Sequence, residues 1–98
     1  MPDLRAEILA EIRRVFSVDL EVLEPVEPHH ELARDLRVDS MGAIVLAVAL
    51  EDRFRVKLSE DEAAAVVTVE DLVNLVERRS REALAEGDAE QGGTRGAR

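Results

Sequence analysis

Residues 40–54 constrain the fold most, because this segment is apolar on two opposite sides when it is arranged as a helix. At about 100° per residue, Leu46, Leu50 and Phe54 fall on one side. The other side continues toward an acidic end and is formed by Met41, Ile44, Val45, Val48, Glu51 and Asp52. A helix in a small bundle needs only one apolar side for its core. The second side is therefore predicted to be a recognition surface for a partner protein.

The remaining apolar spacings predict an all-α four-helix bundle with a long first connection and a short third helix. The expected helices are residues 3–16, 40–54, 60–66 and 69–85. Ser59 with Glu62 forms the pattern of a capping box before the third helix. Residues 1–82 are predicted to be one domain. Residues 83–98, rich in glycine and charge, are expected to be a disordered tail.

Composition excludes several classes of function. The net charge of −9 argues against nucleic acid or an anionic membrane surface as the main partner. Cysteine is absent, so neither a disulfide framework nor a thiolate metal site is expected. The first residues lack the pattern of a secretion signal, and the longest apolar run is too short to span a bilayer. We expect a cytoplasmic monomer.

No motif predicts an enzyme. The two histidines, His29 and His30, are adjacent in a loop, where solvated side chains are the simplest interpretation and a metal site is not expected. The chain contains no catalytic triad pattern, zinc motif or phosphate-binding loop.

Ser40 is the one candidate for covalent chemistry. Asp39 is suited to cap the helix that begins there, which leaves the Ser40 hydroxyl spare. A phosphate ester on Ser40 would be stabilised by the free N–H groups and the dipole of the helix N-terminus. The alternative interpretation is that the hydroxyl satisfies a backbone N–H in the first turn.

Four segments together resemble the acyl carrier proteins. They are residues 31–41 (ELARDLRVDSM), 49–54 (ALEDRF), 58–63 (LSEDEA) and 68–72 (TVEDL), in the family's order and spacing. The resemblance implies that Ser40 carries 4′-phosphopantetheine, added by a phosphopantetheinyl transferase that uses coenzyme A. It also implies that the arm's thiol carries acyl groups as thioesters between acyl-transfer and ketosynthase-type enzymes, and that the domain itself catalyses nothing.

The chain departs from the family at four positions, of which Met41 in place of leucine is a conservative change. Arg37 stands where the family usually has glycine, and we hypothesise that Arg37 lies near the phosphodiester and pairs with it. Val45 stands where an acid is common, so docking should depend more on apolar contact; the alternative is that Val45 packs under the first connection. Gly42 replaces a polar helix former and costs up to about 1 kcal/mol of helix stability.

The leading hypothesis is a carrier in fatty-acid or polyketide-type biosynthesis. Asp39, Ser40 and Arg37 are its predicted cofactor-binding residues. A peptidyl or aminoacyl carrier remains a rival within the same class. An unmodified helical interaction module, which would use the exposed apolar side alone, is the rival from a different class.

Overall fold

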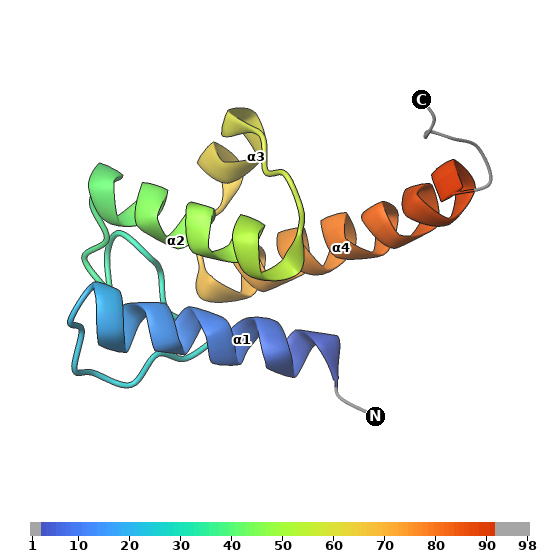
Figure 1. Cartoon of the computed structure of the whole chain (residues 1–98). Helices are drawn as coiled ribbons and strands as arrows, with labels where there is room; N and C mark the ends of the chain where they lie inside the picture. Colours follow the sequence, from blue (N-terminus) through green and yellow to red (C-terminus); the bar gives the residue numbers. More distant parts are fainter. Residues whose placement is uncertain (1–2, 92–98) are drawn as a thin grey trace.

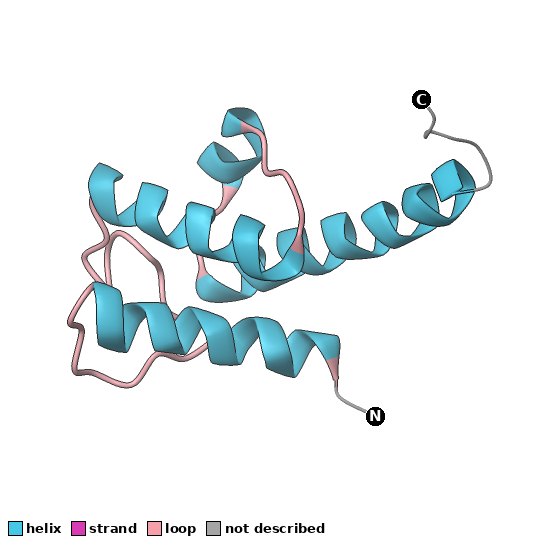
Figure 2. Cartoon of the chain, in the orientation of Figure 1, coloured by secondary structure: helices cyan, strands magenta, loops and turns pink. Residues whose placement is uncertain are grey.

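The fold is described by a computed structural model that covers residues 3–91. It contains the α-helices α1 (Leu4–Arg14), α2 (Ser40–Phe54), α3 (Glu60–Ala65) and α4 (Val69–Gln91). A single π-helical turn, η1 (Val15–Asp19), continues α1. Helices α1 and α2 run in opposite directions, and each contacts α4 (Figure 1). Loops join these helices without a strand in the part of the chain that is described (Figure 2).

The predicted all-α architecture, with its long first connection and short third helix, is confirmed. Two predicted boundaries were wrong by more than one residue. The π-turn carries the first helix past residue 16 to Asp19. Helix α4 continues to Gln91, so the described part of the predicted tail, residues 83–91, has a helical backbone. Residues 92–98 of that tail lie outside the described residues, and the domain limit at residue 82 stays a prediction.

The core forms where the apolar sides of α1, α2 and α4 meet. Asp3 caps α1 by accepting a hydrogen bond from the backbone N–H of Arg5. The buried cluster comprises Ile8, Ile12, Val15, Phe16, Val26, Leu36, Leu46, Leu50, Val69, Leu72, Val73 and Val76. Full burial of one such aliphatic or aromatic side chain contributes about 1.5–3 kcal/mol. These contacts fix the orientation of α2, and with it the position of Ser40.

The long first connection is held by its backbone as well as by its side chains. The N–H of Leu32 donates to the carbonyl of Val67. In return, the carbonyls of His30 and Pro28 accept the N–H groups of Val69 and Glu70. The first turn of a helix has no internal partners for its N–H groups, so these bonds also cap α4. The connection is therefore part of the bundle, and it leads into α2 at a defined angle.

Helix α3 is attached differently, because none of its residues is buried. Ser59 and Glu62 form the predicted capping box, with bonds of 3.0 and 3.2 Å. The Glu62 carboxylate also accepts hydrogen bonds from the guanidinium groups of Arg78 and Arg79 on α4, each at 3.0 Å. The Ser59 N–H, followed by the Arg79 guanidinium, holds the pKa of Glu62 below its usual value. A six-residue helix is unstable alone, so this carboxylate is a main attachment of α3 to the bundle.

Replacing Glu62 with glutamine is expected to loosen α3 selectively. Glutamine keeps the capping box but loses both ion pairs, so amide hydrogen exchange at Ala63 and Val66 should accelerate roughly fivefold. The same loosening is expected in acid. The folded-state pKa is lowered, so the stabilisation is complete above the unfolded glutamate pKa of about 4.3 and is lost as the pH falls toward the folded value. Glu60→Gln makes the same charge change in the same first turn but breaks no ion pair, so it loses only the interaction with the helix dipole and should accelerate exchange much less. Equal acceleration in both variants would contradict the prediction.

Candidate functional site

Helix α2 begins with a cap that does not use the serine. Asp39 Oδ1 accepts the N–H of Gly42 at 2.8 Å. The hydroxyls at the starts of the next two helices do cap: Ser59 Oγ accepts the N–H of Glu62, and Thr68 Oγ1 that of Asp71. Among the described residues, the hydroxyl of Ser40 has no hydrogen-bond partner, and the side chain is exposed. The alternative in which Ser40 serves as a cap is therefore wrong.

Gly42 is buried directly behind this turn. A Cβ atom at that position would lie 3.3 Å from Asp39 Oδ1, 3.3 Å from Val38 Cγ1 and 3.7 Å from a methyl group of Leu20. The π-turn and the segment after it bring Leu20 against the start of α2. The glycine that reduces helix propensity thus allows close packing beneath the cap.

Arg37 has a backbone φ of 59°, in the left-handed region. For a residue other than glycine this conformation costs roughly 1–2 kcal/mol. The turn before Asp39 therefore does need positive φ, and Arg37 accepts the strain. Its side chain is exposed, and no carboxylate of the described chain lies within 4 Å of it.

Arg37→Gly is accordingly expected to stabilise the fold by about 0.5–1 kcal/mol, because the strain that glycine removes exceeds the entropy that it adds to the unfolded chain. Urea unfolding measures the change. Arg34→Gly is the matched control, since Arg34 is exposed in the same connection but is not among the left-handed residues. It should lose stability. A loss of stability in Arg37→Gly as well would contradict the prediction.

Behind Ser40, the predicted recognition side of α2 is only partly exposed. Met41, Ile44 and Val48 are 67, 58 and 56% exposed. Val45 is half-buried and packs against the core cluster. Its packing under the first connection stays a prediction. The exposed members, Met41, Ile44, Val48 and Asp52, are called the α2 face below.

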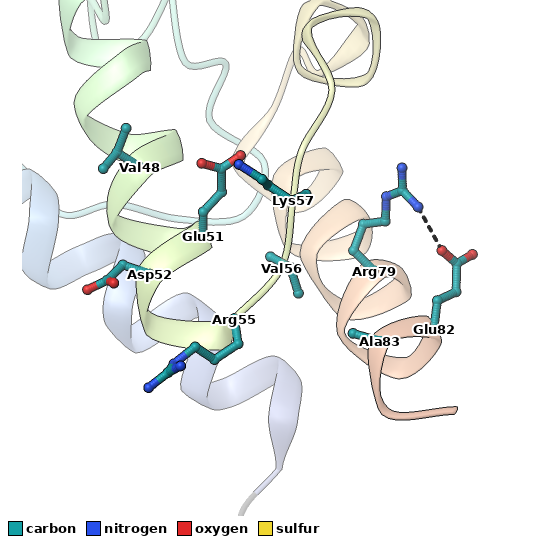
Figure 3. A pocket seen from close by; sticks show the side chains of 9 residues that line it. All are labelled: Val48, Glu51, Asp52, Arg55, Val56, Lys57, Arg79, Glu82 and Ala83. Atoms are coloured by element: carbon teal, nitrogen blue, oxygen red, sulfur yellow. Dashed lines mark hydrogen bonds and ion pairs between the residues drawn. The ribbon is translucent and has the colours of Figure 1, made fainter. Parts of the chain in front are cut away.

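The two acids at the end of α2 differ in their surroundings. Glu51 is half-buried, and its Oε2 accepts the N–H of Leu58 at 2.9 Å, so it ties the following loop to the helix. Asp52 is exposed. Beside them lies a groove of about 660 Å³ between α2, the loop after it and α4 (Figure 3). Its lining consists of Val48, Glu51, Asp52, Arg55, Val56, Lys57, Arg79, Glu82 and Ala83.

Sequence reasoning missed this groove, because its walls come from segments about 25 residues apart. The cations at Arg55 and Lys57 are visible in the sequence. The left-handed turn that ends α2 leads into the loop that places them in the lining of the groove.

One of the two histidines has a structural role. His30 Nδ1 accepts the N–H of Glu27 at 3.0 Å, while His29 is exposed. Among the side chains that the structure describes, residues 3–84, no group of three or more His, Cys, Asp or Glu residues is arranged to hold a metal ion. No described helix is both long and apolar enough to cross a membrane.

The chain is similar to known proteins in both sequence and fold. Residues 6–76 match the family model described as a phosphopantetheine attachment site. The chain is 40% identical over 73 residues to acyl carrier protein 3 of Ralstonia nicotianae, covering 71% of this chain and 82% of that protein. It is 31% identical to the meromycolate extension acyl carrier protein of Mycobacterium tuberculosis, covering 84% of this chain and 72% of that protein. The crystal structure of an acyl carrier protein from Thermotoga maritima is similar, with a TM-score of 0.72 and 25% identity. The match covers 81% of this chain and 93% of that chain.

The residues at the start of α2 are compatible with the cofactor of this family. A free serine hydroxyl stands at a helix N-terminus, where a phosphate is electrostatically favoured. The chain belongs to the acyl carrier proteins, and it carries acyl groups in fatty-acid or polyketide-type biosynthesis with 4′-phosphopantetheine as its prosthetic group.

Proposed function

We propose that Ser40 is the residue to which 4′-phosphopantetheine is attached. The observation that carries the proposal is the free, exposed hydroxyl of Ser40 at a helix start that Asp39 already caps. In the attachment, the serine oxygen loses its proton and attacks the phosphate that bears the pantetheine arm of coenzyme A. The new P–O bond completes the phosphodiester, while the pyrophosphate P–O bond breaks and adenosine 3′,5′-bisphosphate leaves. The thiol at the far end of the arm supplies the thioester chemistry that the protein side chains lack.

The surroundings of Ser40 support this assignment. The first N–H groups of α2 have no partners within the helix, and the helix dipole favours a negative phosphodiester there. Asp39 keeps the turn in place through its bond to Gly42. Arg37, three residues before Ser40, has no ion-pair partner among the described residues, and we assign it to the phosphodiester. A guanidinium suits this role, because it can donate two parallel hydrogen bonds to phosphate oxygens.

The α2 face is the proposed docking surface for the enzymes that modify and use the carrier. Members of the family interact with transferases and biosynthetic enzymes. For this chain we propose a phosphopantetheinyl transferase, acyl-transfer enzymes and ketosynthase-type enzymes. Three exposed apolar side chains next to the attachment residue support a contact centred on Met41, Ile44 and Val48. Val45 and Glu51 contribute less than predicted, because both are half-buried and Glu51 is hydrogen-bonded.

Acyl carrier proteins carry substrates rather than convert them. That this chain catalyses nothing, works as a cytoplasmic monomer and uses residues 1–82 as its carrier domain are predictions that accompany the proposal.

Intact-mass measurement after incubation with coenzyme A and a broad-specificity phosphopantetheinyl transferase tests the attachment. A gain of one phosphopantetheine group, located on Ser40 by fragmentation, is the expected result. No gain, or a gain on another residue, would overturn the assignment. Arg37→Ala should slow the modification severalfold without abolishing it, because it removes a partner of the phosphate and leaves the hydroxyl in place; an unchanged rate would contradict the role given to Arg37.

A further inference from the structure

Met41 differs chemically from the other apolar residues of the α2 face. Its side chain is 67% exposed, more than those of Ile44 and Val48. A peroxide oxidises the thioether of methionine to a sulfoxide, which turns a flexible apolar side chain into a polar one. Isoleucine and valine have no sulfur and do not undergo this reaction. The α2 face therefore contains one apolar side chain whose polarity a mild oxidant can change.

Few other groups of the chain compete for such an oxidant. The sequence contains two methionines and neither cysteine nor tryptophan nor tyrosine. The other methionine, Met1, lies outside the described residues. Susceptibility to oxidation follows exposure, and Met41 is exposed. Within the described part of the chain, Met41 is thus the side chain most open to a peroxide.

The thioether also lies close to the proposed attachment residue. Met41 follows Ser40 in the first turn of α2, and side chains on a helix lean toward its N-terminus. The sulfur is therefore directed toward the turn that presents Ser40. Ile44, one turn further along, is 58% exposed and continues the apolar surface. An enzyme that reaches the Ser40 oxygen is expected to contact both side chains.

We propose that Met41 is a redox modification site, and that its oxidation to the sulfoxide reversibly weakens docking on the α2 face. A lone pair of the sulfur attacks one oxygen of a peroxide, so that an S–O bond forms, the O–O bond breaks and water or an alcohol leaves. The sulfur is oxidised and the peroxide is reduced. A methionine sulfoxide reductase reverses the change, since the oxygen leaves as water while two thiols become a disulfide. The inference rests on the proposed function, because it concerns regulation of the surface proposed there for docking.

The sulfoxide is expected to disturb docking and not the fold. Met41 belongs neither to the core cluster nor to the partly buried residues packed against it. The start of α2 is held by the N–H groups of Gly42 and Ala43, which donate to the side chain and the carbonyl of Asp39 at 2.8 and 2.9 Å. Oxidation of the sulfur leaves these bonds intact. In a docked complex, by contrast, the polar S–O group would be buried against an apolar surface, which is costly without a hydrogen bond.

Peroxide treatment of the full chain, before phosphopantetheine is attached, tests the proposal. Intact mass and fragmentation are expected to locate one added oxygen on Met41, separately from any on Met1. A broad-specificity phosphopantetheinyl transferase then provides two measurements: its dissociation constant for the chain without coenzyme A, and kcat/KM for loading with coenzyme A. We expect affinity and kcat/KM each to fall at least about fivefold, and reductases for both sulfoxide epimers to restore them. Unchanged affinity after complete oxidation of Met41, or no binding by the untreated chain, would overturn the proposal.

Met41→Leu is the matched control, because leucine keeps the apolar volume and removes the sulfur. The untreated variant should bind the transferase within about twofold of the unsubstituted chain, and peroxide should change neither its affinity nor its loading. Equal losses in both proteins would place the effect outside Met41 and refute the proposal. The midpoint of urea unfolding should be the same before and after oxidation of the unsubstituted chain. A lower midpoint after oxidation would show that Met41 supports the fold, and would also refute the proposal.

The two measurements separate this proposal from the attachment at Ser40. A loss of affinity on oxidation, in a chain that is never loaded, refutes the attachment alone. Loading on Ser40 that oxidation of Met41 leaves unchanged refutes the inference alone.

Discussion

Replacing Ser40 with alanine is expected to abolish attachment of phosphopantetheine completely. The phosphodiester needs the serine oxygen, and no neighbouring hydroxyl can replace it in the turn between Val38 and Gly42. Stability should change by less than about 0.5 kcal/mol, because the Ser40 hydroxyl makes no hydrogen bond in the described structure. Intact mass reports the attachment, and urea unfolding reports the stability.

Ser59→Ala is the matched control, since it removes the same hydroxyl from the start of another helix. Ser59 Oγ caps α3 through the N–H of Glu62 at 3.0 Å. Its loss should cost about 1 kcal/mol and leave attachment intact. A Ser40→Ala variant that still gains mass, or that loses as much stability as Ser59→Ala, would contradict the description of Ser40 as a spare hydroxyl.

Local signals made the helices predictable. The bounds of α2, residues 40–54, were correct because Asp39 marks its start by capping chemistry and the apolar periods stop at Phe54. The end of α1 was not predictable in this way. The π-turn at Val15–Asp19 depends on packing Phe16 into the core and Leu20 against α2, and neither contact has a local signature.

The sequence predicted which residues form the site, but not which of them are buried or hydrogen-bonded. The hydroxyl at Ser40 and the apolar residues behind it could be placed on one helix from spacing alone. Burial of Val45 depends on the angle at which α2 meets the rest of the bundle, which periodicity does not give. The bond from Leu58 to Glu51 depends on the path of a loop, and the groove depends on the position of α4.

The departures from the family at Arg37 and Gly42 can both be explained by their positions on either side of the Asp39 cap. Both flank the cap at Asp39, and each departs from what local propensity would favour: Arg37 is held at positive φ, and Gly42 stands inside a helix. Gly42 allows Val38 and Leu20 to pack beneath the cap. Arg37 places a cation beside a helix start where, by our proposal, a phosphodiester is formed. Local conflicts of this kind are expected where function competes with stability.

Truncating a side chain to alanine should cost much more stability on the buried side of α2 than on its exposed side. Leu50 is fully buried, so Leu50→Ala is expected to cost about 2–5 kcal/mol, a large share of the roughly 5–15 kcal/mol that stabilises a domain of this size. Val48, two residues earlier, is 56% exposed, and Val48→Ala should cost less than about 0.5 kcal/mol. Urea unfolding of both variants measures the contrast. If Val48→Ala destabilised the fold as much as Leu50→Ala, the second apolar side of α2 would be core, and no surface would remain for docking.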